Sequence, residues 1–356
     1  MAKLSVDQAL IRARFHVKKD EVTEAQKIYQ AVLLAFPQNK RAQEGLVALN
    51  KLKQNHPIQN PSQEAINQLV NLYNQGQLSL VVEQAQALTK QYPEAFVVWN
   101  ILGTSAVNIG MLDQAITAFK KLILLKPDYA EAYFNLGVTL QHQDKLDEAI
   151  KAYTKSLLIK TDYADAYFNL GIALQEQSKL DEAIAAYKKA LLINPDYADT
   201  FYNLGNAYRD QGKFEEAIKA FKEAILLKPH YAEAYNNMGV VYQYQGKLSK
   251  AIDVCNKALS IKPDFTDAYI NIGNILKDQG KLEKSIEVYK SLLSIKSDCA
   301  EAHKNLSFAL LNKGELKEGL DEYEWRWKTN KFFSQQRHFL QPLWDGKESL
   351  SSKRIL

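Results

Sequence analysis

Residues 198–231 read ADTFYNLGNAYRDQGKFEEAIKAFKEAILLKPHY and carry two sets of apolar residues at helical spacing. The first set is Phe201, Leu204 and Tyr208, and the second is Ala217, Phe221 and Ala224. Spacings of three and four residues place each set on one face of a helix. Gly212 lies between the sets and suits a left-handed helix end, and Pro229 prevents the second helix from continuing. The segment therefore predicts two short helices joined by a tight turn.

The same arrangement recurs along the chain with a period of 34 residues. Each repeat is numbered here so that its first glycine is position 8, which makes residue 198 position 1 of the segment above. These glycines are Gly103, Gly137, Gly171, Gly205, Gly239 and Gly273. Alanine at position 20 and proline at position 32 keep the same step, with Thr161 replacing one proline. A single helical hairpin cannot bury its apolar stripes alone, so successive hairpins must stack.

This period and these marked positions resemble the tetratricopeptide repeat (TPR) family. The resemblance implies an all-α fold, a right-handed superhelical solenoid of about nine 34-residue helix-turn-helix repeats. We expect a TPR-like unit plus a helix over 1–54, a linker over 55–61 and the main superhelix over 62–333. Its repeats are expected to start near 62, 96, 130, 164, 198, 232, 266 and 300, with a junction segment over 334–356.

Composition argues against several classes of protein. Lysine plus arginine (45) against aspartate plus glutamate (41) leaves a net charge of +4, too small for an electrostatic nucleic-acid binder. The sequence contains no apolar run of about 18 residues that would predict a membrane span, and the N-terminus lacks the apolar core of a signal peptide. We therefore expect a cytoplasmic protein that binds neither nucleic acid nor membrane.

Motifs for catalysis or metal binding are missing from the sequence. Cys255 and Cys299 have no partner at metal-ligand spacing. No P-loop, nucleophile elbow or dinucleotide fingerprint occurs. We expect no metal, no cofactor and no catalysis by this chain, and we interpret His303 as a core histidine with satisfied hydrogen bonds.

The face opposite the buried stripe of the first helix carries a repeated amide. In the TPR family this side, with positions 2, 6, 9 and 13, lines the concave groove. Position 6 is asparagine in six successive repeats: Asn135, Asn169, Asn203, Asn237, Asn271 and Asn305. An asparagine amide can pair with both the N–H and the C=O of a bound peptide unit. The first helices of successive repeats, here called the inner helices, are expected to lie roughly 8–10 Å apart. They would present one amide to about every third residue of an extended peptide.

Two interpretations of these asparagines remain open, peptide binding and bridging between adjacent inner helices. The array resembles the repeat region of O-linked N-acetylglucosamine transferase, where such a ladder contacts substrate polypeptide, and this resemblance favours binding. The predicted groove further includes Phe134, Phe168 and Tyr202 at position 5, and Asn206 and Asn274 at position 9. The aromatic residues would either dock partner side chains or pack against neighbouring helices. Some family members clamp a C-terminal carboxylate with lysine at position 5, but only Lys304 matches that pattern.

Acidic residues occupy position 2 of the same six repeats: Glu131, Asp165, Asp199, Glu233, Asp267 and Glu301. They would form either an acidic stripe for basic partners or part of a helix cap. We favour the cap, because an aspartate three residues earlier, such as Asp128, would serve as N-cap with an acidic partner close to capping-box spacing.

The C-terminal segment departs from the repeat and is rich in aromatic residues, including Trp325, Trp327 and Trp344. It resembles the junction of bacterial proteins that join TPRs to a glycosyltransferase-like α/β domain, or else forms an aromatic plug over the last repeat. We predict a non-catalytic scaffold that binds extended polypeptide in the groove. The alternatives are a substrate-recruiting arm of a longer glycosyltransferase and self-association through the imperfect end repeats at 62–95 and 300–333.

Overall fold

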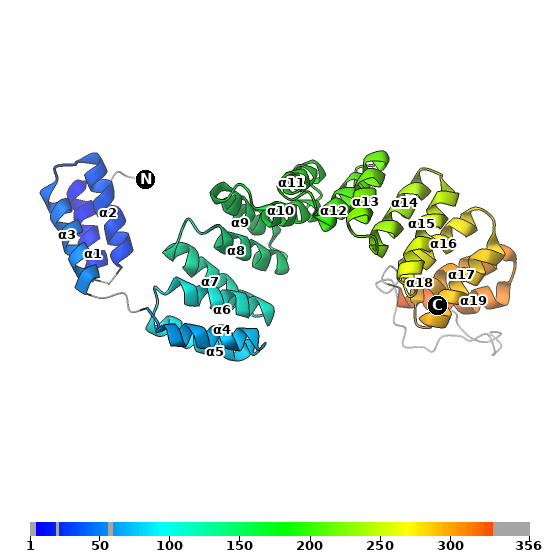
Figure 1. Cartoon of the computed structure of the whole chain (residues 1–356), viewed down its shortest axis with the longest axis horizontal. Helices are drawn as coiled ribbons and strands as arrows, with labels where there is room; N and C mark the ends of the chain where they lie inside the picture. Colours follow the sequence, from blue (N-terminus) through cyan, green and yellow to red (C-terminus); the bar gives the residue numbers. More distant parts are fainter. Residues whose placement is uncertain (1–4, 19–20, 56–59, 330–356) are drawn as a thin grey trace, which may run out of the picture. The chain divides into compact units, whose positions relative to one another are not determined.

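The structure, a computed structural model, describes residues 5–18, 21–55 and 60–329. Within these ranges the chain forms nineteen α-helices, one short 3-10 helix (η1) and no strand. The chain divides into two compact units, residues 1–160 (unit 1) and 161–356 (unit 2). Within each unit, successive helices pack side by side as pairs (Figure 1). The predicted all-α repeat fold is confirmed.

Nine helix pairs and one additional helix, α3, account for the described α-helices. Unit 1 contains α1 (Val6–Lys18), α2 (Val22–Ala35), α3 (Lys40–Asn55), α4 (Gln63–Asn74), α5 (Leu78–Gln91), α6 (Phe96–Asn108), α7 (Leu112–Leu125), α8 (Ala130–His142) and α9 (Leu146–Ile159). Unit 2 contains α10 (Ala164–Glu176), α11 (Leu180–Ile193), α12 (Ala198–Asp210), α13 (Phe214–Leu227), α14 (Ala232–Tyr244), α15 (Leu248–Ile261), α16 (Thr266–Asp278), α17 (Leu282–Ile295), α18 (Ala300–Lys313), α19 (Leu316–Tyr323) and η1 (Glu324–Lys328).

In the eight repeats from residue 62 onward, the turn between the two helices adopts the left-handed conformation predicted for position 15. Gly212 has φ of 73°, and a residue without a Cβ reaches that region without strain. Asp144 and Ser178 hold the same position with φ of 59° and 61°. The turn geometry is therefore kept even where glycine is absent, with the same backbone hydrogen bond across the turn, such as that from the Lys145 N–H to the Leu140 carbonyl.

The close packing between the two helices of a repeat explains the glycine at position 8. Phe221 of α13 is fully buried, and a Cβ added to Gly205 of α12 would lie 2.6 Å from its Cε1 atom. The ring therefore packs directly on the backbone of the first helix. In the next repeat Cys255 replaces the ring, and burial raises the pKa of its thiol to about 12. Full burial of a large apolar side chain such as Phe221 contributes roughly 1.5–3 kcal/mol to stability.

The predicted capping box is wrong. The N-cap of α8 is Tyr129 rather than Asp128, and no side chain caps the helix. The same holds for α10, α12, α14, α16 and α18, whose N-caps are Tyr163, Tyr197, Tyr231, Phe265 and Cys299. The aspartate lies in the turn that follows the position-32 residue, one residue before the cap, so the position-2 acid is the second helical residue.

The last described repeat is closed by contacts of His303. Its Nδ1 atom bonds the Glu322 carboxylate, its Nε2 atom bonds the carbonyl of Ser297 at 2.9 Å, and its ring stacks on Trp325 with centroids 3.9 Å apart. The interpretation of His303 as a core histidine with satisfied hydrogen bonds is confirmed. The predicted junction at 334–356 lies outside the described residues, as do residues 56–59 of the predicted linker. No described helix has the length and apolar character needed to cross a membrane.

Candidate functional site

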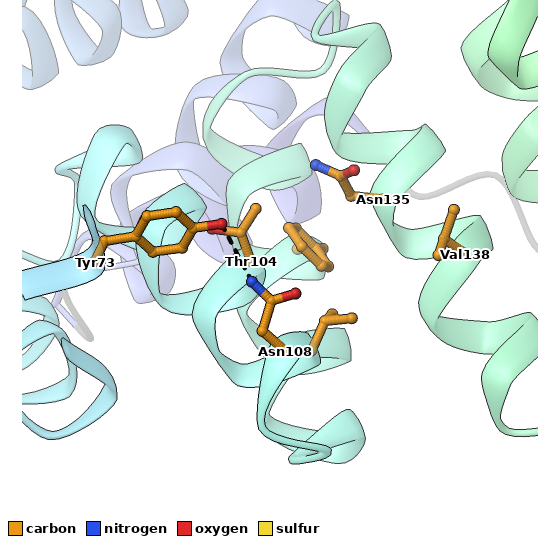
Figure 2. A pocket seen from close by; sticks show the side chains of 7 residues that line it. Tyr73, Thr104, Asn108, Asn135 and Val138 are labelled. Atoms are coloured by element: carbon orange, nitrogen blue, oxygen red, sulfur yellow. Dashed lines mark hydrogen bonds between the residues drawn. The ribbon is translucent and has the colours of Figure 1, made fainter. Parts of the chain in front are cut away.

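A pocket opens on the inner face of unit 1, between three successive first helices of the repeats. It has a volume of about 170 Å³ and is lined by Tyr73 of α4, Thr104, Val107 and Asn108 of α6, Phe119 of α7, and Asn135 and Val138 of α8. Figure 2 shows Asn135 and Val138 on one helix facing Thr104 and Asn108 across the pocket. Most of these lining residues occupy positions 6, 9, 12 and 13, so the pocket lies on the predicted groove face.

Asn135 is the predicted ladder residue that reaches this pocket. Its side chain is half-buried and makes no hydrogen bond to any residue that the structure describes. The Thr104 hydroxyl donates to the carbonyls of Asn100 and Ile101 in its own helix, and Asn108 Nδ2 donates to the Tyr73 hydroxyl at 3.2 Å. The Asn135 amide therefore keeps both its donors and its acceptor for a ligand.

Asn169 and Asn203 turn back onto their own helices. Asn169 Nδ2 donates to the carbonyl of Asp165, and Asn203 Nδ2 donates to the carbonyl of Asp199, both at 2.9 Å. Both side chains are half-buried. These bonds use one donor of each amide and leave the amide oxygen without a partner among the described residues.

Asn237 and Asn271 bridge neighbouring repeats in unit 2. Asn237 Nδ2 donates to the Tyr202 hydroxyl (3.0 Å) and to Asn206 Oδ1 (2.9 Å). Asn271 Nδ2 donates to Asn236 Oδ1 at 2.9 Å. At these two positions the asparagines link inner helices, as the second interpretation of the ladder predicts.

Two further predicted residues are engaged in different ways. Asn305 of α18 is buried, with 7% of its surface exposed. Asn274 of α16 accepts a hydrogen bond from the Tyr289 hydroxyl at 2.8 Å through Oδ1. The six asparagines of position 6 thus do not form one uniform surface.

The aromatic residues of position 5 pack against their neighbours and remain half-buried. Phe134 meets the Tyr153 ring at 6.0 Å between centroids. Phe168 lies 4.9 Å from the Tyr197 ring, and Tyr202 lies 4.9 Å from the Tyr231 ring. Such contacts stabilise the helix pairs and leave part of each ring on the surface.

Four of the six acidic residues of position 2 pair with residues near the end of their own repeats: Glu131, Asp165, Asp199 and Glu233. Asp199 accepts a hydrogen bond from the Tyr231 hydroxyl at 2.8 Å and lies 3.7 Å from Lys228 Nζ. Glu131 lies 3.5 Å from Lys160 Nζ. Burial and the hydrogen bond to Asp199 both raise the pKa of Tyr231. These carboxylates hold the two ends of those four repeats together, in place of the predicted capping role.

Sequence reasoning missed Tyr73, Thr104 and Asn108 as pocket residues. They occupy positions 12, 9 and 13 of their repeats, and two of these positions were already assigned to the groove face. Positions 9 and 13 were part of the predicted groove face, but the residues named on it were those of the repeats that carry asparagine at position 6, and Tyr73, Thr104 and Asn108 belong to the two repeats before them. Among the described residues, no group of three or more histidine, cysteine, aspartate or glutamate side chains could hold a metal ion.

Comparison with known families identifies the repeats directly. A profile described as TPR repeat matches residues 107–144, 175–208, 205–246 and 273–314. A profile described as Tetratricopeptide repeat matches residues 130–163 and 232–265. The chain belongs to the tetratricopeptide repeat family. No curated protein that was compared with this TPR chain is significantly similar to it.

Solved structures share the repeat architecture. The crystal structure of MamA is 31% identical over 46% of this chain and 95% of MamA, with a TM-score of 0.44. YrrB, described as a TPR protein with an unusual peptide-binding site, is 22% identical over 52% of this chain and 96% of YrrB, with a TM-score of 0.47. The APC/C hetero-tetramer Cut9-Hcn1 is 19% identical over 86% of this chain and 56% of that chain, with a TM-score of 0.51, and this similarity is one of fold.

Proposed function

We propose that this TPR protein is a non-catalytic scaffold that binds an extended polypeptide segment on the inner face of its repeats, in the cytoplasm. The observation that carries the proposal is the pocket between α4, α6 and α8, where the Asn135 amide has no hydrogen bond to a described residue. Asn135 would pair with one peptide unit of the ligand, and the pocket would receive an adjacent side chain against Val107 and Val138.

The affinity of such a site is expected to be modest. A net hydrogen bond contributes about 0.5–1.5 kcal/mol, and ordering a flexible peptide offsets part of the gain. Recognition through backbone amides also favours broad specificity, because every residue of a ligand presents the same N–H and C=O groups.

The test uses two asparagines of the same repeat position that differ in their surroundings. Bound peptides are first captured with the wild-type chain and identified by mass spectrometry, and their affinity is then measured for variants. Asn135→Ala should weaken binding roughly 2- to 10-fold without changing the circular dichroism spectrum. Asn237→Ala should leave the affinity unchanged and lower the unfolding temperature, since it removes the bonds to Tyr202 and Asn206.

Unchanged affinity in Asn135→Ala would show that the peptide does not use this pocket. An equal loss in both variants would point to a general effect on the stacking of the repeats.

A further inference from the structure

A second pocket lies among the three N-terminal helices. Its volume is about 400 Å³, and its lining includes Arg14 of α1, Tyr29 of α2, and Arg41, Glu44 and Gly45 of α3. Val17 and Leu49 provide apolar wall. The residues of this pocket are separate from those of the pocket that contains Asn135, and its lining is charged where the other is amide-bearing.

Tyr29 is the buried polar group of this pocket. Only 3% of its surface is exposed, and a Cβ added to Gly45 would lie 2.5 Å from its Cζ atom, which carries the hydroxyl. The hydroxyl end of the ring is therefore directed to the backbone of α3 beside the pocket. The Tyr29 hydroxyl makes no hydrogen bond to a described residue.

Other tyrosines at the same repeat position have an internal acceptor. Tyr153 and Tyr187 donate to the side chains of Gln141 (2.9 Å) and Gln175 (3.0 Å) at position 12, and Tyr289 donates to Asn274 (2.8 Å) at position 9. In the N-terminal repeat, positions 9 and 12 are held by Arg14 and Val17, and neither side chain offers an acceptor. The hydroxyl of Tyr29 thus lacks the partner that the other repeats supply.

The charges around the pocket favour an anion with a single negative charge. Arg14 forms no ion pair with a described residue, whereas Arg41 pairs with Asp7 at 2.6 Å. The charged lining residues Arg14, Arg41 and Glu44 sum to one net positive charge. A carboxylate matches this charge and accepts from both a guanidinium and a phenol, whereas a phosphate dianion would be repelled by Glu44.

We propose that this pocket binds an acidic side chain of a partner polypeptide. The carboxylate accepts hydrogen bonds from the Arg14 guanidinium and the Tyr29 hydroxyl, and an apolar neighbour in the ligand packs on Val17 and Leu49. The proposal does not depend on the peptide site of Asn135, because the two pockets share no residue.

The ligand specificity is tested by calorimetric titration of the full chain with three heptapeptides. The first is acetylated and amidated Ser-Ala-Leu-Glu-Val-Ala-Ser, the second has glutamine in place of glutamate, and the third is the glutamine peptide with a free C-terminal carboxylate. The glutamate peptide should bind at least about tenfold more tightly than either glutamine peptide, with an affinity that falls as salt is added. Equal affinity for the first two peptides overturns the proposal. Tight binding of the third overturns the assignment to a side-chain carboxylate.

Two variants test the residues with the glutamate peptide. Tyr29→Phe keeps the ring against Gly45 and should weaken binding roughly 2- to 10-fold without lowering the unfolding temperature, since no internal bond is lost. Arg14→Gln should weaken binding at least about tenfold. The matched control Tyr153→Phe should lower the unfolding temperature and leave the affinity unchanged. Wild-type affinity in both Tyr29→Phe and Arg14→Gln would overturn the proposal.

Discussion

Asn135 in unit 1 and Asn237 in unit 2 occupy the same repeat position in different surroundings. Asn237 donates to Tyr202 and Asn206, which are positions 5 and 9 of the preceding repeat. The residues that correspond to them before Asn135 are Asn100 and Thr104. The Thr104 hydroxyl is bonded within its own helix, and Asn100 Oδ1 is buried without a partner. The Asn237 amide is thus paired with the repeat before it, whereas the Asn135 amide is not.

Asn271 and Asn203 in unit 2 show the same contrast. Asn271 follows a repeat whose position 5 is Asn236, and it donates to that side chain. Asn203 follows a repeat with Phe168 and Ile172 at these positions. Neither of those side chains has an acceptor, and Asn203 bonds its own helix instead. Asn206 and Asn236 thus turn the next asparagine into a structural bridge, whereas Asn203, which follows two apolar side chains, does not bridge.

The largest expected effect tests whether the two units have equivalent cores although their inner faces differ. Phe119 of unit 1 and Phe221 of unit 2 are both fully buried at position 24. Phe119→Ala and Phe221→Ala should each lower the local free energy of unfolding by about 3–5 kcal/mol. Hydrogen exchange of α6 and α7, and of α12 and α13, measures each loss where it occurs.

Only Phe119→Ala should also weaken peptide binding, because Phe119 lines the pocket of Asn135. A cost that is several-fold smaller in one unit would show that the cores are not equivalent.

A smaller effect is expected from moving the acceptor of unit 2 into unit 1. Thr104→Asn places an amide at position 9 before Asn135, as Asn206 stands before Asn237. The new bond should raise the free energy of unfolding by about 0.5–1.5 kcal/mol and reduce peptide affinity by a similar amount, about 2- to 10-fold. Thermal unfolding and peptide titration of the same preparation measure both quantities. The conservative control is Thr104→Val, which adds no acceptor and should leave Asn135 available.

If Thr104→Asn binds peptide as well as the wild type does, then pairing within the inner face does not govern access to Asn135. The comparison between the two units would then lose its functional meaning.

Much of the fold could be predicted from the sequence because each repeat repeats the same local physics. The stripes at helical spacing, the left-handed residue at position 15 and the glycine that faces Phe221 each depend on residues within one hairpin. The N-caps of the first helices were predicted one residue early. The chain turns after Pro127, and Tyr129 rather than Asp128 becomes the cap of α8.

The state of the candidate site could be predicted only in part. Position 6 indicates which side chains face inward, but hydrogen bonds such as that from Asn237 to Asn206 join residues 31 positions apart. These hydrogen bonds depend on which side chains stand at positions 5 and 9 of the preceding repeat, and the asparagine at position 6 does not by itself predict them. The N-terminal pocket was missed for a related reason, since Arg14 and Tyr29 belong to the repeat with the fewest marked positions.

The smallest expected effect concerns the tyrosines at position 34, whose hydroxyl groups have different hydrogen-bond partners in the two units. In unit 2 the Tyr197 hydroxyl donates to Asp165 at 3.1 Å. The pKa of Tyr197 is raised to about 12, mainly by burial and further by the nearby Asp165 carboxylate. In unit 1 the equivalent Tyr129 makes no hydrogen bond through its hydroxyl to a described residue, because position 2 of its repeat is Val97. Tyr197→Phe should therefore cost about 1 kcal/mol at pH 7, and Tyr129→Phe should cost less.

The pH dependence of this difference has a definite sign. The raised pKa means that folded Tyr197 holds its proton where the unfolded chain, with a pKa near 10, has lost it. The stabilisation is complete below pH 10 and is lost as the pH rises towards about 12. The gap in urea midpoint between the wild type and Tyr197→Phe should close over that range. A gap that stays constant from pH 9 to pH 12 would contradict the raised pKa of Tyr197, because it would show that the folded and unfolded chains lose the phenol proton over the same pH range.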